Sequence, residues 1–80
     1  MNPRDIELLI EQGLDGASAS VVTDGQGHYE AVVVCPAFDG KRQVPRHQMV
    51  YATLGERVGR EIHALAVKTY TPDEWQARQD

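Results

Sequence analysis

The fold is decided by residues 17–35, which read ASASVVTDGQGHYEAVVVC. Apolar and polar residues alternate over 17–23, which is typical of a strand with one buried face. The Asp-Gly-Gln-Gly sequence at 24–27 favours a tight chain reversal. Residues 28–35 end in the run 31–35, which is apolar on both faces and therefore indicates a strand in the centre of the sheet. The stretch therefore predicts a β-hairpin whose second strand lies in the middle of a sheet.

Helix signals flank this hairpin on both sides. Asn2 followed by Pro3 combines a good N-cap with proline at the first helical position, and predicts a helix over residues 3–12. Gly13 then fits a helix C-cap. Pro45 predicts the start of a second helix, in which the later glycines at 55 and 59 favour a break.

A third strand and a last helix complete the pattern. Residues 62–69 predict the strand, with His63 near its start. Thr71-Pro72-Asp73-Glu74 is a capping box with proline at the first helical position, and Trp75 is the apolar anchor of the helix that follows. The order α-β-β-α-β-α predicts an α+β fold with a three-stranded sheet and helices packed on one face.

Size and composition limit the class of protein. The chain has 80 residues, of which 41% are hydrophobic and 25% charged, as expected for a single globular domain over 1–80. No apolar run approaches the roughly 20 residues of a membrane span. The first residues lack a signal-peptide pattern, and a single cysteine rules out an intramolecular disulfide, so we expect a cytoplasmic protein.

The charge pattern leaves two readings open. The formal net charge is −4, whereas nucleic-acid binders usually carry a basic surface. Residues 41–60 are nevertheless locally basic, with five cations against one acid. This segment is either a solvated helix face or a docking patch. The cations are Lys41, Arg42, Arg46, Arg57 and Arg60, and the acid is Glu56.

The residues do not indicate an enzyme. Cys35 is the only thiol, and its place at the end of an apolar strand predicts a buried, inert side chain. The chain has no G-x-S-x-G turn, no P-loop, no G-x-G-x-x-G and no H-E-x-x-H. We therefore expect a protein that acts by binding a partner.

Three histidines are the remaining candidates. His28 lies at the end of the hairpin turn, His63 at the start of the third strand, and His47 in the first turn of the middle helix. A single histidine is more often an ordinary surface residue than a ligand. Two histidines cannot fill a structural zinc site, but they can provide half of a labile site that another molecule completes.

Several motifs together resemble the BolA family. Their order and spacing agree with the family over residues 38–75, and the turn at 24–29 is similar to the short-loop bacterial branch that includes the acid-stress protein IbaG. The motifs are FDG at 38–40, VPRHQMVY at 44–51, IHAL at 62–65 and KTYTPDEW at 68–75. Cys35, where serine is expected, and Pro45, which stiffens the helix start, depart from the family pattern.

The resemblance implies a class II KH-like fold and partnership with a monothiol glutaredoxin. It implies that His63 ligates a [2Fe-2S] cluster shared with the glutaredoxin and glutathione, with His28 as the conditional second ligand. Two imidazoles on one iron raise the reduction potential, as in Rieske centres. Acid weakens such a site because protons compete with the metal for imidazole. The isolated protein is expected to hold no cluster and to be a monomer or weak homodimer.

Two alternatives stay open at this point. Some BolA relatives are described as transcription factors, so a DNA-binding regulator would use Lys41, Arg42, Arg46 and His47 as its binding residues. A module that docks a partner without any metal would bind its partner equally well when His63 is replaced by alanine.

Overall fold

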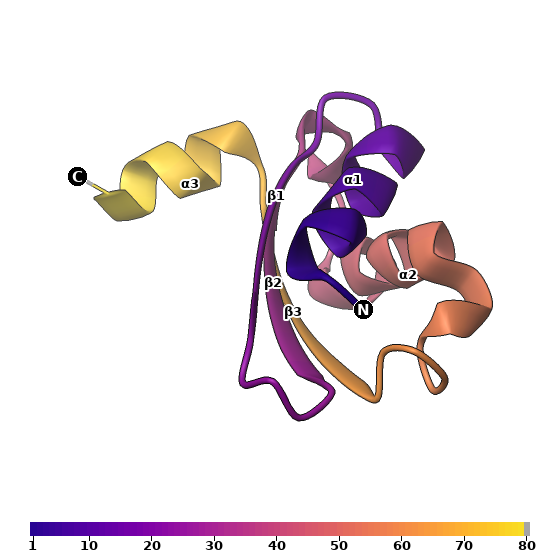
Figure 1. Cartoon of the computed structure of the whole chain (residues 1–80). Coiled ribbons are helices and arrows are strands. Elements are labelled where there is room, and N and C mark those ends of the chain that lie inside the picture. Colours follow the sequence, from indigo (N-terminus) through magenta and orange to yellow (C-terminus); the bar gives the residue numbers. More distant parts are fainter. Residues whose placement is uncertain (80) are drawn as a thin grey trace.

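The computed structural model describes residues 1–79 and contains the predicted order of elements (Figure 1). Two short 3₁₀ turns lie before and after the middle helix. The elements are α1 (Pro3–Gly13), β1 (Ser18–Thr23), β2 (His28–Val34), α2 (Gln43–Leu54), β3 (Ala64–Tyr70) and α3 (Pro72–Gln79), and the 3₁₀ turns are Pro36–Phe38 and Gly55–Arg57.

The sheet has the order β1-β2-β3, so the apolar strand is central, as predicted. β1 pairs with β2 in antiparallel fashion across the hairpin, and β2 pairs with β3 in parallel. Ala31 and Val33 of β2 are fully buried. The parallel register aligns His28 with Ala64 at one end of the strands and Val34 with Tyr70 at the other.

The helices are distributed unequally over the sheet. α1 and α2 cover one face, as expected, whereas α3 extends from the end of β3 on the other side (Figure 1). The core between the sheet and the two covering helices is apolar, which supplies most of the stability of a small domain. Among the described residues, no helix is long and apolar enough to cross a membrane. The largest fully buried side chains are Phe38, Ile6, Ile10, Leu54, Ile62, Val33, Val50 and Cys35.

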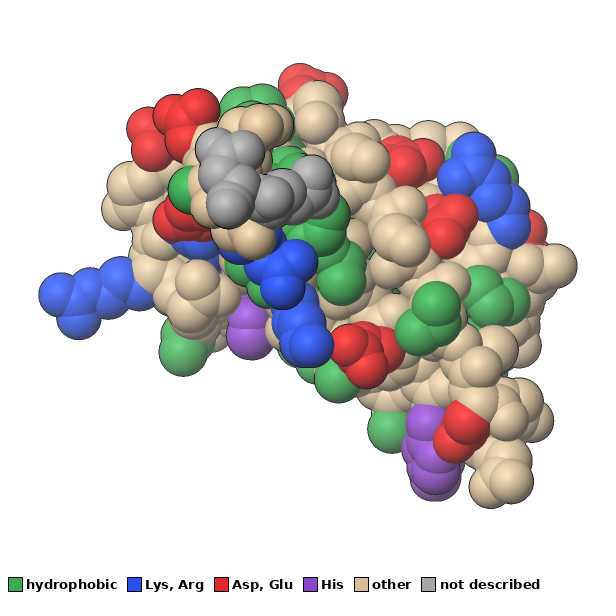
Figure 2. Space-filling model, turned by 90° about the vertical axis from the view of Figure 1, so that its left-hand side faces the viewer, with side chains coloured by type: hydrophobic (Ala, Val, Ile, Leu, Met, Phe, Trp, Pro, Cys, Tyr) green, Lys and Arg blue, Asp and Glu red, His purple; other side chains and the backbone are tan. Residues whose placement is uncertain are grey.

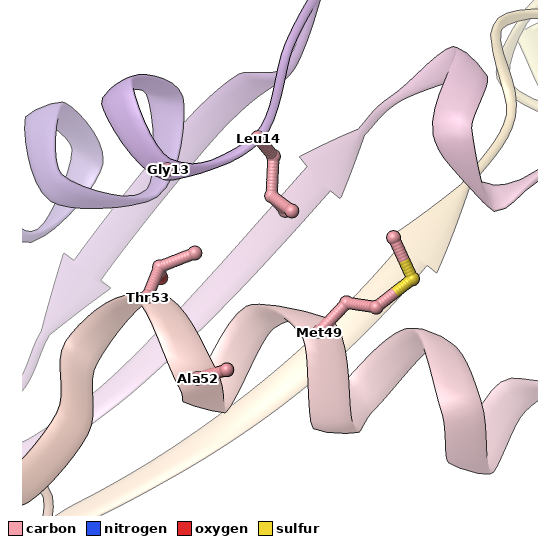
Figure 3. A pocket seen from close by; sticks show the side chains of 5 residues that line it. All are labelled: Gly13, Leu14, Met49, Ala52 and Thr53. Carbon is pink, nitrogen blue, oxygen red and sulfur yellow. The ribbon is translucent and has the colours of Figure 1, made fainter.

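The first helix begins as predicted but ends differently. Asn2 caps it, with its Oδ1 accepting a hydrogen bond from the Arg4 amide at 2.8 Å. Gly13 is not the C-cap, because it is the last helical residue and Leu14 is the cap. A Cβ on Gly13 would lie 2.6 Å from Cγ2 of Thr53. The glycine is therefore needed for close contact with α2, beside a shallow apolar pocket that Leu14 and Met49 also line (Figure 3).

The middle helix starts two residues before the predicted position. Its first residue is Gln43, and Pro45 is the third, where the missing amide removes no intrahelical hydrogen bond. His47 consequently lies in the second turn, not the first. Gly55 ends the helix with φ of +58°, which confirms the predicted break.

The third strand spans residues 64–70 instead of 62–69, so His63 immediately precedes it. The capping box of α3 is confirmed. Thr71 Oγ1 accepts from the Glu74 amide at 3.1 Å, and Glu74 Oε1 accepts from the Thr71 amide at 2.8 Å. The same Glu74 carboxylate accepts two bonds from Arg46 of α2, at 2.7 and 3.1 Å. Arg46 thus ties α3 to the body of the domain.

Candidate functional site

Two of the three histidines meet at one corner of the molecule. The ring centroids of His28 and His63 are 5.6 Å apart, with the ring planes at 44°. They come close because β2 and β3 run in parallel and pair from His28 and Ala64 onward. Both residues are exposed. Figure 2 shows histidine side chains at one corner of this face, with an acidic side chain beside them. The site joins the hairpin turn to the start of β3, 35 positions later in the sequence.

Gly27 permits this approach. Its carbonyl accepts the first hydrogen bond of the parallel ladder, from the Ala64 amide at 3.0 Å. Its φ is +84°, a conformation that glycine adopts without steric penalty. A Cβ at this position would lie 2.9 Å from Cβ of His63, closer than real Cβ contacts allow. The space that Gly27 leaves is therefore the space in which His63 lies beside His28.

Asp24 organises the turn and is a site residue that was not predicted from the sequence. Its Oδ1 accepts from the Gln26 amide at 2.7 Å, and its Oδ2 lies 3.0 Å from Nδ1 of His28. These contacts lower the pKa of Asp24 below its usual value, and the hydrogen bond from the Gln26 amide has the larger effect. In the tautomer that carries its proton on Nδ1, His28 donates to this carboxylate, and the Nε2 lone pair is then available to bind a metal. An acid four residues before a turn histidine was the available sequence signal.

Cys35 lies at the opposite end of the sheet. It is fully buried, and its Sγ donates to the Asp15 carbonyl at 3.4 Å, as expected for a structural thiol. It follows directly after β2, while His28 begins that strand. Seven strand residues at about 3.3 Å each separate the two by roughly 23 Å. Cys35 therefore does not reach the histidine pair.

The donor set of the pair suits a shared metal site. The rings are near enough for one nitrogen of each to reach a single metal ion at the roughly 2.1 Å of imidazole–metal bonds. Within residues 1–79, no group of three or more His, Cys, Asp or Glu side chains is arranged to hold a metal ion. Any iron or zinc bound here would take its other ligands from a second molecule.

The basic segment does not form one patch. Lys41 and Arg42 are exposed before α2, whereas Arg57 and Arg60 follow it, about 18 Å away along a 12-residue helix. Arg46 was predicted to be a binding residue, but its side chain is only 6% exposed and forms an ion pair with Glu74. It is therefore not available to bind a partner. Its Nε also donates to the Lys41 carbonyl at 2.8 Å.

His47 is half-buried on α2 and does not belong to the histidine pair. Of the predicted partner-binding residues, the structure thus leaves Lys41 and Arg42 fully accessible, His47 in part, and Arg46 enclosed. The sequence did not predict that Arg46 is buried, because its partner Glu74 lies 28 positions later, in α3.

Comparison with known proteins identifies the family to which the chain belongs. A family model described as BolA-like protein matches residues 4–74. The chain is 41% identical over 61 residues to the DNA-binding transcriptional regulator BolA of Escherichia coli K12, covering 76% of this chain and 58% of the relative. It is 34% identical over 76 residues to the acid stress protein IbaG of the same strain, covering 94% and 89%.

A solved structure of a BolA homologue has the same fold as this chain. The structure of a bolA protein homologue from Coxiella burnetii matches with a TM-score of 0.85 and 45% identity, covering 95% of this chain and 97% of the other. The chain spans somewhat over half the length of the relatives named BolA and BolA-like protein 1, with 52–58% covered. Because the family model extends over nearly the whole described chain, and fold and sequence agree with it, the chain belongs to the BolA family.

Proposed function

We propose that this protein is the cytosolic partner of a monothiol glutaredoxin and shares a [2Fe-2S] cluster with it, for iron–sulfur trafficking, iron regulation or stress response. His63 and His28 supply the two ligands on this side. The cysteine of the glutaredoxin and glutathione supply the others. The observation that supports the proposal is the exposed histidine pair, with ring centroids 5.6 Å apart, in which His28 begins β2 and His63 immediately precedes β3.

The chain's own residues have distinct parts in this proposal. Asp24 orients the His28 ring through Nδ1, at 3.0 Å, so that Nε2 faces outward. Gly27 leaves room for His63. The cluster, when bound, supplies a one-electron redox centre whose potential is raised by two imidazole ligands. No group on this chain is required to act as a catalyst.

Mixing with a cluster-loaded monothiol glutaredoxin tests the proposal. Wild-type protein should change the visible absorption and circular dichroism of the cluster and form a complex on size exclusion. The His63→Ala variant should lose the spectral change, and His28→Ala should weaken it. His47→Ala is the matched control for the cluster spectrum and should keep the full spectral change, because this histidine lies apart from the pair.

Each alternative outcome has a meaning. An unchanged spectrum without a complex would exclude the proposal. Complex formation that is identical in His63→Ala and wild type, again with no spectral change, would instead favour a docking module without metal.

A DNA-binding regulator is the second candidate, because the Escherichia coli relative bears that name. The exposed Lys41 and Arg42 are the residues for phosphate contacts. This reading predicts DNA binding that weakens with salt and is lost in Lys41→Glu/Arg42→Glu. A gel-shift or anisotropy titration measures it, and no binding at low salt would exclude it.

A further inference from the structure

Within residues 1–79, one face of the sheet is left without a covering helix along most of its length. α1 and α2 pack on the other face, and α3 leads away from the end of β3 (Figure 1). Side chains alternate between the two faces along each strand, so the exposed and half-buried positions point to the uncovered side. We call this side the open face, and Figure 2 looks onto it. Its middle is formed by Ser20, Val22, Glu30, Val32, Ala66 and Lys68.

His28 lies at one end of the open face. It is the first residue of β2, and strand alternation places its side chain on the same side as Glu30 and Val32. The Tyr70 ring marks the other end, where its centroid is 5.3 Å from that of Trp75 of α3. Six residue steps of about 3.3 Å separate the two ends, so the face is roughly 20 Å long. A protein that supplies ligands to a metal on His28 therefore approaches from this side.

A shallow hollow of about 380 Å³ adjoins His28 on the open face. Val22, Glu30 and Ala66 line it from the three strands, and Asp24 and His28 line it from the turn. Val22 is 61% exposed and so offers an apolar contact at the rim of the hollow. The hollow makes the open face and the histidine site one continuous surface.

The charges of the open face distinguish between possible occupants. Asp24 and Glu30, which line the hollow, are acidic. Lys68 lies in the middle of the face, but its Nζ is 3.2 Å from Oε1 of Glu30, so the three groups together are net negative. Arg78 of α3 lies at the far end, over the Tyr70 ring at 5.1 Å. Acidic groups next to the histidine site disfavour the phosphates of a nucleic acid and favour a protein surface with basic side chains.

We propose that the glutaredoxin that completes the cluster docks on the open face, with basic side chains of its own at the hollow beside His28. The inference rests on the proposed function, since the occupant is the protein that carries the cluster. Continuity of the hollow with His28 sets the position of the partner. The acids Asp24 and Glu30 set the charge of the surface that it presents.

Methyl cross-saturation tests this placement. The protein is deuterated, carries protonated alanine and valine methyl groups, and is mixed with a protonated, cluster-loaded monothiol glutaredoxin whose signals are irradiated. The methyl signals of Val22, Val32 and Ala66 should lose intensity, because they lie at the interface. Ala31 and Val33, which alternate with Val32 on β2 and are fully buried on the side of the helices, should keep theirs.

The outcomes separate this inference from the proposed function. If the cluster spectrum changes while the methyl groups of the open face keep their intensity, the docking face is wrong and cluster sharing stands. If no complex forms, both are contradicted. Loss of intensity caused by a single-stranded oligonucleotide or by a protonated copy of this chain, but not by the glutaredoxin, would also overturn the inference.

Arginine substitutions at two exposed valines give an independent test. Val22 is 61% exposed on the open face, and Val44 is 67% exposed on α2, on the other side of the sheet. Val22→Arg should weaken glutaredoxin binding about tenfold or more, because it sets a long cation against a basic surface, whereas Val44→Arg should bind as wild type. Val22→Glu should bind more tightly than Val22→Arg.

Isothermal titration calorimetry measures these affinities, and thermal unfolding checks that the variants are folded. Equal affinity of Val22→Arg and Val44→Arg would overturn the docking face. Tighter binding of Val22→Arg than of Val22→Glu would overturn the basic character of the partner surface.

Discussion

Gly27→Ala is expected to reduce cluster uptake from the glutaredoxin by about 10- to 100-fold, the range typical of lost support around metal ligands. The new Cβ would lie 2.9 Å from Cβ of His63, so the two imidazoles could not keep their present separation. The backbone at this residue also has φ of +84°, which alanine adopts at a penalty on the order of 1–2 kcal/mol. Visible circular dichroism of the mixed complex measures the loss.

Gly25→Ala is the matched control. Gly25 lies in the same turn with φ of +83°, but a Cβ there would have no neighbour within 4 Å. It therefore imposes the same backbone strain without a contact to His63. Thermal unfolding should show destabilisation of both variants, at least as large in Gly27→Ala as in Gly25→Ala, and only Gly27→Ala should lose the cluster. Equal cluster uptake by the two would contradict the role given to Gly27.

Arg46→Ala is expected to destabilise the protein by about 2–3 kcal/mol, because hydrogen bonds to charged groups contribute about 1.5–3 kcal/mol. The enclosed guanidinium bonds both oxygens of Glu74 and the Lys41 carbonyl, and it lies 5.8 Å from the centroid of the Phe38 ring. Urea denaturation measures the change. Arg42→Ala, which removes an exposed neighbour, should be nearly neutral, and equal stability of the two variants would refute this account of Arg46.

The same pair predicts an acid dependence of stability. Arg46, and then the Thr71 amide, lower the pKa of Glu74 from 4.5 to about 2. A carboxylate with a depressed pKa stabilises the folded state above the unfolded value, and this contribution is lost as the pH falls from about 4.5 to about 2. Glu74→Gln should remove that part of the pH dependence. An unchanged slope in urea titrations across this interval would argue against the Arg46–Glu74 pairing.

Local signals in the sequence were sufficient for much of the fold. The 31–35 apolar run predicted the central strand, and the turn at 24–27 predicted the hairpin. The capping box predicted α3 from short-range hydrogen bonds that form within four residues. These features were predictable because each depends on neighbours in the sequence. That His28 and His63 lie together follows from the parallel pairing of β2 and β3. From the sequence, only the resemblance to the BolA family linked the two residues, as ligands of one cluster.

Features set by tertiary contacts were not predictable in the same way. From the sequence, Arg46 was predicted to belong to an exposed basic segment. In the structure its side chain is buried and forms an ion pair with Glu74, 28 positions later. Gly13 looked like a helix cap, but its role is contact with Thr53. The role of Asp24 was not predicted, although its spacing from His28 was a signal; the structure shows that its carboxylate contacts both the Gln26 amide and the His28 ring.

The central claim is that imidazoles of this chain ligate the cluster, and pulsed electron paramagnetic resonance tests it most directly. The protein is labelled with 15N-histidine, mixed with an unlabelled cluster-loaded monothiol glutaredoxin, and the cluster is reduced. The account predicts strong hyperfine coupling to two 15N nuclei in the wild type, reduced to one in His28→Ala, lost in His63→Ala and unchanged in His47→Ala. A reduced cluster in the mixed complex with no 15N coupling would contradict histidine ligation.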